Sequence, residues 1–178
     1  MNAANDSVVV LHRALDQTAD VLTGVRRDQL SLPTPCEDWD VARLIAHLVA
    51  APTNFLTMAQ GGQPEWSAEP PPVTGDWTAA FRSAADDLIH VWHQAADSAD
   101  AGSVDWQTAE FAVHTWDLAR ATGQSTDLDP EVAERGLAFM SASLTPENRG
   151  HAFGTEVAVP DGAPVYDRLA AFAGRDPR

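Results

Sequence analysis

The chain has 178 residues, 44% of them hydrophobic, and this composition indicates one packed globular domain rather than a disordered segment. It carries 26 acidic and 11 basic residues, giving a formal net charge of −15, and the resulting negative field argues against nucleic acid or anionic membranes as partners. A single cysteine excludes an intramolecular disulfide framework and any zinc site built from several cysteines.

The amino terminus, MNAANDSVVV, has no basic segment leading into an apolar run, so no secretory signal is predicted. No segment approaches the roughly 20 apolar residues of a membrane span. We therefore expect a cytoplasmic protein with no membrane partner.

The amino-terminal part of the chain predicts two helices separated by a turn. Apolar residues recur at helical spacing over residues 7–25, and Asp6 stands where a helix cap is expected. The proline-pinned segment LPTPCED, residues 32–38, predicts the turn. Asp40 can then cap a second helix, whose apolar stripe is Val41, Leu44, Ile45, Leu48 and Val49.

Proline and glycine divide the rest of the chain. Residues 61–75 contain four prolines and predict a long loop. A third helical stripe runs from Trp77 to Val91, a fourth helix covers 109–123, and a fifth begins at Pro130 and carries Leu137, Met140 and Leu144. We expect four or five antiparallel helices.

The carboxyl-terminal tail is predicted to cap this bundle. Residues 153–164 are predicted to be extended or irregular, and Pro164 then begins a short helix that stops at Gly174. The sequence thus predicts an all-α fold in one domain over residues 1–178.

Four of the six histidines have simple structural explanations. His12 lies near the apolar stripe of the first helix, where a hydrogen-bonded structural role is at least as good an interpretation as a functional one. His151 lies in a glycine-flanked connection and is expected to face solvent. A third group resembles a metal cluster but lies opposite an apolar stripe, as a solvated face does; its members are Asp86, Asp87, His90, His93 and Gln94.

His47, Glu110 and His114 are less easily explained. His47 lies beside the apolar stripe of the second helix, where a buried imidazole needs a hydrogen-bond partner, and a backbone carbonyl would suffice. Glu110 and His114 are four residues apart and so share one helix face, either as a surface ion pair or as joint ligands. Trp106 and Val113 lie on the same face, which is unusual for a surface pair.

Three segments carry a resemblance to a known family: PTPCEDWDVARLIAHLV (33–49), AEFAVHTWDLARATG (109–123) and FGTEVAVPDGAPVYDRLAAFAGRDP (153–177). They resemble the DinB-like superfamily, and more narrowly a small actinobacterial branch of the metal-binding amino-terminal domains of mycothiol-dependent maleylpyruvate isomerase. The resemblance implies a four-helix bundle with long connections that holds a divalent metal, usually zinc. It assigns the ligands to His47, Glu110 and His114.

Two imidazoles and one carboxylate leave a tetrahedral zinc with an open position, which is typical of reactive sites, although Ni²⁺ or Fe²⁺ would suit the same donors. A thiol bound there is deprotonated. The resemblance thus implies a metal- and mycothiol-dependent transferase or isomerase acting on a small electrophile, and a homodimer as a candidate assembly. We expect Cys36 to be a packed small hydrophobe, and Trp116, Arg43 and Trp66 to contact the thiol's sugar portion.

Two other interpretations remain open. A zinc hydrolase would use metal-bound water and a general base, for which Asp117 is the local candidate, although a salt bridge to Arg120 or Arg43 explains Asp117 equally well. The second interpretation is a non-catalytic metal-binding or interaction module. The connection from Trp92 to Trp106 is short for the family and no counterpart of the isomerase's second domain follows, so we expect maleylpyruvate to be a poor substrate.

Overall fold

The computed structural model describes residues 3–66, 68–95, 100–149 and 153–178. Within these ranges the chain is helical, with no β-strand, and the predicted all-α class is confirmed. The elements are α1 (Ala3–Thr23), the 3₁₀ helix η1 (Arg27–Gln29), α2 (Val41–Ala59), α3 (Trp77–Gln94), α4 (Ala101–Thr122), α5 (Pro130–Ser143) and α6 (Val165–Phe172).

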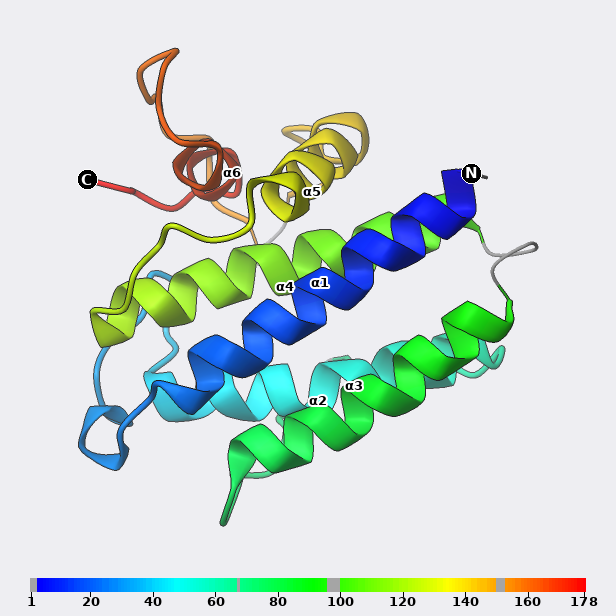
Figure 1. Ribbon diagram of the computed structural model, residues 1–178. Coiled ribbons are helices and arrows are strands. Elements are labelled where there is room, and N and C mark those ends of the chain that lie inside the picture. The colour runs from blue at the N-terminus through cyan, green and yellow to red at the C-terminus, as the bar shows by residue number, and fades with distance from the viewer. Residues whose placement is uncertain (1–2, 67, 96–99, 150–152) are drawn as a thin grey trace.

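The four long helices α1 to α4 form the bundle (Figure 1). α1 and α2 each pack against both α3 and α4, so α1 lies diagonally opposite α2, and α3 lies diagonally opposite α4. α5 packs on α4 and α1, and α6 packs on α5 and α4, so the carboxyl-terminal third of the chain covers the side of the bundle formed by α4.

The expectation of antiparallel helices is wrong for two pairs of neighbours, because α1 runs parallel to α4 and α2 runs parallel to α3 (Figure 1). In α1 and α4, Thr18 and Thr115 share a hydrogen bond of 2.7 Å at corresponding positions near the carboxyl ends. The long loop 61–75 explains the direction of α3. Its fifteen residues, at about 3.3 Å each, can return the chain along the length of the bundle.

Aspartate caps fix where most helices begin. Asp40, Asp76, Asp100 and Asp129 each accept a backbone N–H of the following turn. Asp100 starts α4 eight residues earlier than expected. The prediction that Asp6 caps the first helix is wrong, because Asp6 lies inside α1 and pairs with Arg135.

α2 is longer than its apolar stripe suggested and continues through Pro52. An internal proline costs a helix about 3 kcal/mol, which the packing of the fully buried Phe55 beyond it helps to offset. By length and composition α2 could span a membrane, contrary to expectation. It is nevertheless a core helix of the bundle, with apolar residues facing α3 and α4.

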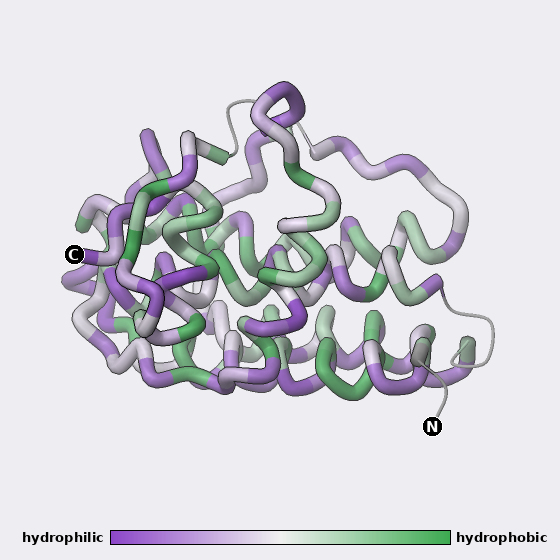
Figure 2. The backbone as a smooth tube through the Cα atoms, turned by 90° about the horizontal axis from the view of Figure 1, so that it is seen from above, coloured by the Kyte–Doolittle hydropathy of each residue, from purple (hydrophilic) through white to green (hydrophobic). Residues whose placement is uncertain are grey.

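Hydrophobic and hydrophilic residues alternate along the helices, as Figure 2 shows, and the apolar positions meet in one core. Phe55 and Phe81 both pack edge-on against Phe111, joining α2, α3 and α4. The sequence leaves two roles open for the runs LIHVWH (88–93) and VDWQTAEF (104–111), a helix-on-helix dimer interface or an internal seam of the core. Both runs contribute buried residues to the core, among them Leu88, Trp92 and Phe111.

The tail is irregular up to α6, as predicted. A backbone hydrogen bond from Val157 N to Ala171 O, at 2.9 Å, ties the middle of this segment to α6. Gly174 ends α6 with a φ of 86° and lies against Gly154, whose Cα would be 2.5 Å from a β-carbon at position 174. Only glycine fits there, and this close contact brings the next residue, Arg175, to the bundle.

Candidate metal centre

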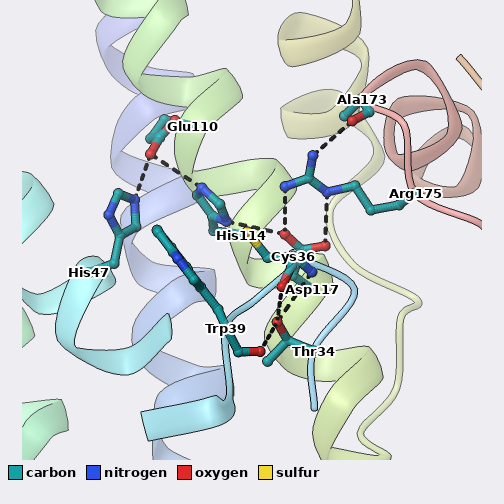
Figure 3. Close-up of polar contacts among 9 residues, drawn as sticks. All are labelled: Thr34, Cys36, Trp39, His47, Glu110, His114, Asp117, Ala173 and Arg175. Carbon is teal, nitrogen blue, oxygen red and sulfur yellow. Dashed lines mark hydrogen bonds and ion pairs between the residues drawn. The ribbon is translucent and has the colours of Figure 1, made fainter. Parts of the chain in front are cut away.

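His47 from α2 meets Glu110 and His114 from α4 inside the bundle (Figure 3). His47 Nε2 lies 2.7 Å from Glu110 Oε1, and His114 Nε2 lies 3.4 Å from the same oxygen. One ligand atom from each residue falls within 4.8 Å of the other two. Ligands at about 2.1 Å from a tetrahedral zinc ion are about 3.4 Å apart. The His114–Glu110 separation already matches this distance, and the His47–Glu110 pair would have to move slightly apart to admit a divalent ion.

Trp39 completes the inner wall of the centre. Its ring lies 4.9 Å from the His47 ring and stacks at 5.8 Å and 19° on the His114 ring. The turn before α2 holds it there, because Thr34 Oγ1 donates to Trp39 O at 2.8 Å and Trp39 N donates to Cys36 O at 3.1 Å. The proline-pinned turn thus positions an aromatic side chain that restricts both imidazoles.

The electrostatics of the centre favour a negatively charged Glu110 carboxylate and a positively charged His114 imidazolium. Burial alone would raise the pKa of the Glu110 carboxyl, but the His114 and His47 imidazoles hold that pKa well below its usual range. Burial would lower the pKa of His114, yet the Glu110 and Asp117 carboxylates outweigh it and raise this pKa to about 9. Without a metal, the carboxylate attracts a proton to the imidazole; a divalent cation would satisfy the same negative charge.

Asp117 lies behind His114 and orients it. Asp117 Oδ2 accepts from His114 Nδ1 at 3.1 Å, which leaves Nε2 directed toward Glu110. The partner of Asp117 is Arg175, so the salt bridges to Arg120 or Arg43 considered from the sequence are wrong. Arg120 instead donates to Pro177 O at 2.7 Å.

A cavity of about 960 Å³ opens beside the three candidate ligands. It lies between the turn before α2, the loop 61–75, α4 and the tail. Its wall includes Cys36, Trp39, Arg43, Trp66, Trp106 and Phe153. The volume suits a small molecule, and aromatic rings with a few polar groups are typical of ligand sites.

Arg43 and Trp66 line this cavity, as proposed for residues that contact a thiol's sugar portion, but Trp116 does not. Trp116 is 1% exposed and belongs to the core, where the alternation of apolar residues along α4 brings it. Cys36 is half-buried at the cavity wall, and burial raises the pKa of its thiol to about 11. A protonated, packed thiol agrees with the role expected for it.

The remaining histidines lie outside the centre. His90 and His93 are exposed on α3, as expected for a solvated face. His12 is about half exposed and lies 3.8 Å from Asp16, so no buried structural role is found for it. His151 lies outside the described residues.

Sequence reasoning missed Trp39 and Arg175. Nothing in the pattern of CEDWDV separates a tryptophan that packs on two imidazoles from one that fills a core. Arg175 follows a helix-ending glycine, where a solvated arginine is expected. Its burial follows from the Gly154 contact, which joins segments twenty residues apart.

A family model described as the mycothiol maleylpyruvate isomerase N-terminal domain matches residues 11–106. The chain belongs to this family. The match covers His47 and Trp39 and ends four residues before Glu110.

Two relatives extend the similarity over nearly all of the chain. They are uncharacterized proteins from two strains of Mycobacterium tuberculosis. Each is 39% identical over 189 residues, covering 97% of this chain and 100% of the relative. No solved structure matches the chain.

Proposed function

We propose that this protein binds one divalent metal ion through His47, Glu110 and His114 and uses it in thiol chemistry. The ion is zinc by ligand type, with nickel or ferrous iron as rivals. The reaction is transfer of mycothiol to a small electrophile, or thiol-assisted isomerisation of that electrophile. The observation that carries the proposal is the meeting of two imidazole nitrogens and one carboxylate oxygen within 4.8 Å beside a cavity of about 960 Å³.

The donor set fits such an ion. Three protein ligands leave a fourth position for substrate, whereas structural zinc sites are closed by four protein ligands. When bound, the metal supplies an acidifying charge that makes a coordinated thiol a thiolate at neutral pH. Cys36 is not needed as a nucleophile, and its raised pKa agrees with that.

The cavity walls supply the selectivity that a metal–sulfur bond lacks. Arg43 lies 5.4 Å above the Trp39 ring and reaches Glu69 at 3.9 Å, so it offers N–H donors at the cavity wall. Trp66 and Trp106, whose rings are 5.9 Å apart, offer flat apolar faces to a sugar. These groups would favour mycothiol over glutathione.

The environment of Asp117 argues against the hydrolase alternative. A hydrolase needs a carboxylate that can reach a water in the cavity. Asp117 is fully buried, does not line the cavity, and binds Arg175 and His114. Its role in the proposed site is to hold His114.

Metal analysis followed by cobalt substitution tests the proposal. Chelator-free protein should contain about one divalent metal per chain. Mycothiol added to the cobalt form should produce a sulfur-to-metal charge-transfer band at lower concentration than glutathione does. Absence of metal would refute the site, and a cobalt spectrum that responds to hydroxamates but not to thiols would replace the thiol reaction with hydrolysis.

We also infer a cytoplasmic location and no nucleic-acid partner, supported by the net charge of −15. Binding to duplex DNA at about 150 mM salt should be undetectable, and a micromolar complex would contradict this. The homodimer implied by the resemblance stays a prediction, which light scattering can test.

A further inference from the structure

Arg175 lies buried directly behind the candidate metal centre (Figure 3). Its Nη2 donates to Asp117 Oδ2 at 3.1 Å and its Nε donates to Asp117 Oδ1 at 3.3 Å. Asp117 Oδ2 also accepts from His114 Nδ1 at 3.1 Å. A continuous chain of hydrogen bonds therefore runs from the carboxyl-terminal tail to a candidate ligand.

Stability alone is a poor explanation for this arrangement. The Arg175 and Asp117 side chains are 4% and 0% exposed, and the attraction between two buried charges must first offset the free energy lost by removing both from water. Apolar residues of similar volume often stabilise a fold as well as a buried ion pair does. The geometry suggests a use for the pair: two contacts from one guanidinium fix the plane of the carboxylate that holds His114.

The tail is built to deliver this guanidinium. Arg175 N donates to Ala170 O at 2.9 Å, and Arg175 Nη1 donates to Ala173 O at 2.7 Å, so both ends of the residue are tied to the end of α6. The close contact of Gly174 with Gly154 holds the same turn against the preceding segment. Arg175 therefore reaches Asp117 from a fixed backbone.

We propose that Arg175 is a positioning residue of the metal centre, acting through Asp117 on the orientation of His114. The proposal rests on the metal site proposed above. Histidine ligands commonly donate their second ring N–H to a carboxylate, and loss of that partner typically weakens metal binding about 10- to 100-fold. The tail residue that fixes this carboxylate then contributes to metal affinity without touching the ion.

Zinc affinity of Arg175→Met, measured by competition with a chromogenic chelator, tests the proposal. We expect a loss of about 10-fold or more. Arg135→Met is the control, because Arg135 also joins helices through ion pairs, with Asp6 and Asp105, but lies away from the centre. Reduced thermal stability of Arg175→Met with unchanged zinc affinity would overturn the proposal.

A double-mutant cycle with Asp117→Asn tests the route. If Arg175 acts through Asp117, Arg175→Met should weaken zinc binding much less in the Asp117→Asn background than in the wild type. Equal losses in the two backgrounds would refute this route. If Arg175→Met does not fold, Arg175→Lys replaces it, because lysine keeps the charge but cannot make both contacts, and it should still weaken binding.

A metal-free measurement separates this proposal from the proposed function. In the apo protein the His114 Nδ1 proton, held by Asp117, should give a downfield NMR resonance that exchanges slowly with water. Arg175→Met should broaden or abolish this resonance, and Arg135→Met should preserve it. If wild-type protein binds no metal, the proposed function fails, while this resonance still decides whether Arg175 positions His114.

Discussion

Helices α3 and α4 both carry histidines and acids at helical spacing, yet only α4 contributes residues to the candidate centre. On α3, Asp86, Asp87, His90 and His93 are all exposed, and His90 reaches only as far as Gln94, at 2.9 Å, on its own helix. On α4, Glu110 and His114 are largely buried and meet His47 from α2. The residue types are the same, and the surroundings differ.

The difference shows that spacing on one helix is not sufficient to bring three metal-ligating side chains together. A pair four residues apart can approach one ion, but the third donor must come from a helix packed opposite. Burial also removes competing water and strengthens each electrostatic contact, as the pKa of His114, raised to about 9, indicates. The exposed group on α3 has neither advantage.

Ligand removal should separate the two helices most strongly. We expect Glu110→Ala and His114→Ala to lose stoichiometric metal, with apparent affinity falling by about 100-fold or more, because two donors remain. Metal analysis of each purified variant after dialysis measures this loss. Asp86→Ala is the matched acid control on α3. Retention of a full metal complement by Glu110→Ala and His114→Ala would refute the assignment of the centre to α4.

The stability of the metal-free protein should depend on pH through His114. Its pKa is about 9 in the folded chain and about 6.5 when unfolded, so the folded state binds the proton more tightly. This stabilisation is complete below pH 6.5 and is lost as pH rises through 9, a decrease on the order of 1–3 kcal/mol in the free energy of unfolding. Urea unfolding between pH 6 and 10 measures it.

The His114→Ala variant provides the control for this pH dependence. It should show a much flatter profile over the same range, because the group with the raised pKa is absent. Zinc-loaded wild-type protein should also be flatter, since an imidazole that binds zinc holds no proton on that nitrogen. Identical profiles for wild type and His114→Ala would contradict the role of His114.

Replacing Trp39 should have a smaller effect. Trp39→Leu removes the ring that packs on both imidazoles and should weaken zinc binding a few-fold, because the ligands gain freedom that binding must then restrict. Chelator competition measures it. Trp66→Leu, at the outer cavity wall, should leave zinc affinity unchanged and weaken mycothiol binding instead. The reverse outcome would exchange the roles assigned to these two tryptophans.

The smallest effect is expected on α3. His90→Ala and His93→Ala should change the free energy of unfolding by less than about 0.5 kcal/mol, as exposed substitutions usually do. Their metal content should equal that of the wild type. A measurable loss of metal in either variant would mean that α3 takes part in metal binding after all.

Much of the fold follows from local chemistry that a sequence displays. Asp40 and Pro130 mark helix starts, Gly123 and Gly174 mark helix ends, and the prolines of 61–75 exclude regular structure. The direction of the helices could not be predicted this way. A loop of fifteen residues permits either direction, and the choice depends on which apolar faces fit together.

The residues of the candidate centre also fall into those that the sequence could indicate and those that it could not. Family resemblance pointed to His47, Glu110 and His114, and helical periodicity by itself places the last two on one face, because i and i+4 neighbours depend only on backbone geometry. The contribution of Trp39 could not be predicted, because the sequence of its turn does not show whether the ring packs on imidazoles or in the core. That of Arg175 could not be predicted, because it reaches the centre from a segment distant in sequence. Tertiary packing alone decided that Asp117 pairs with Arg175 rather than with Arg120 or Arg43, since a buried carboxylate must take the cation that the fold brings beside it.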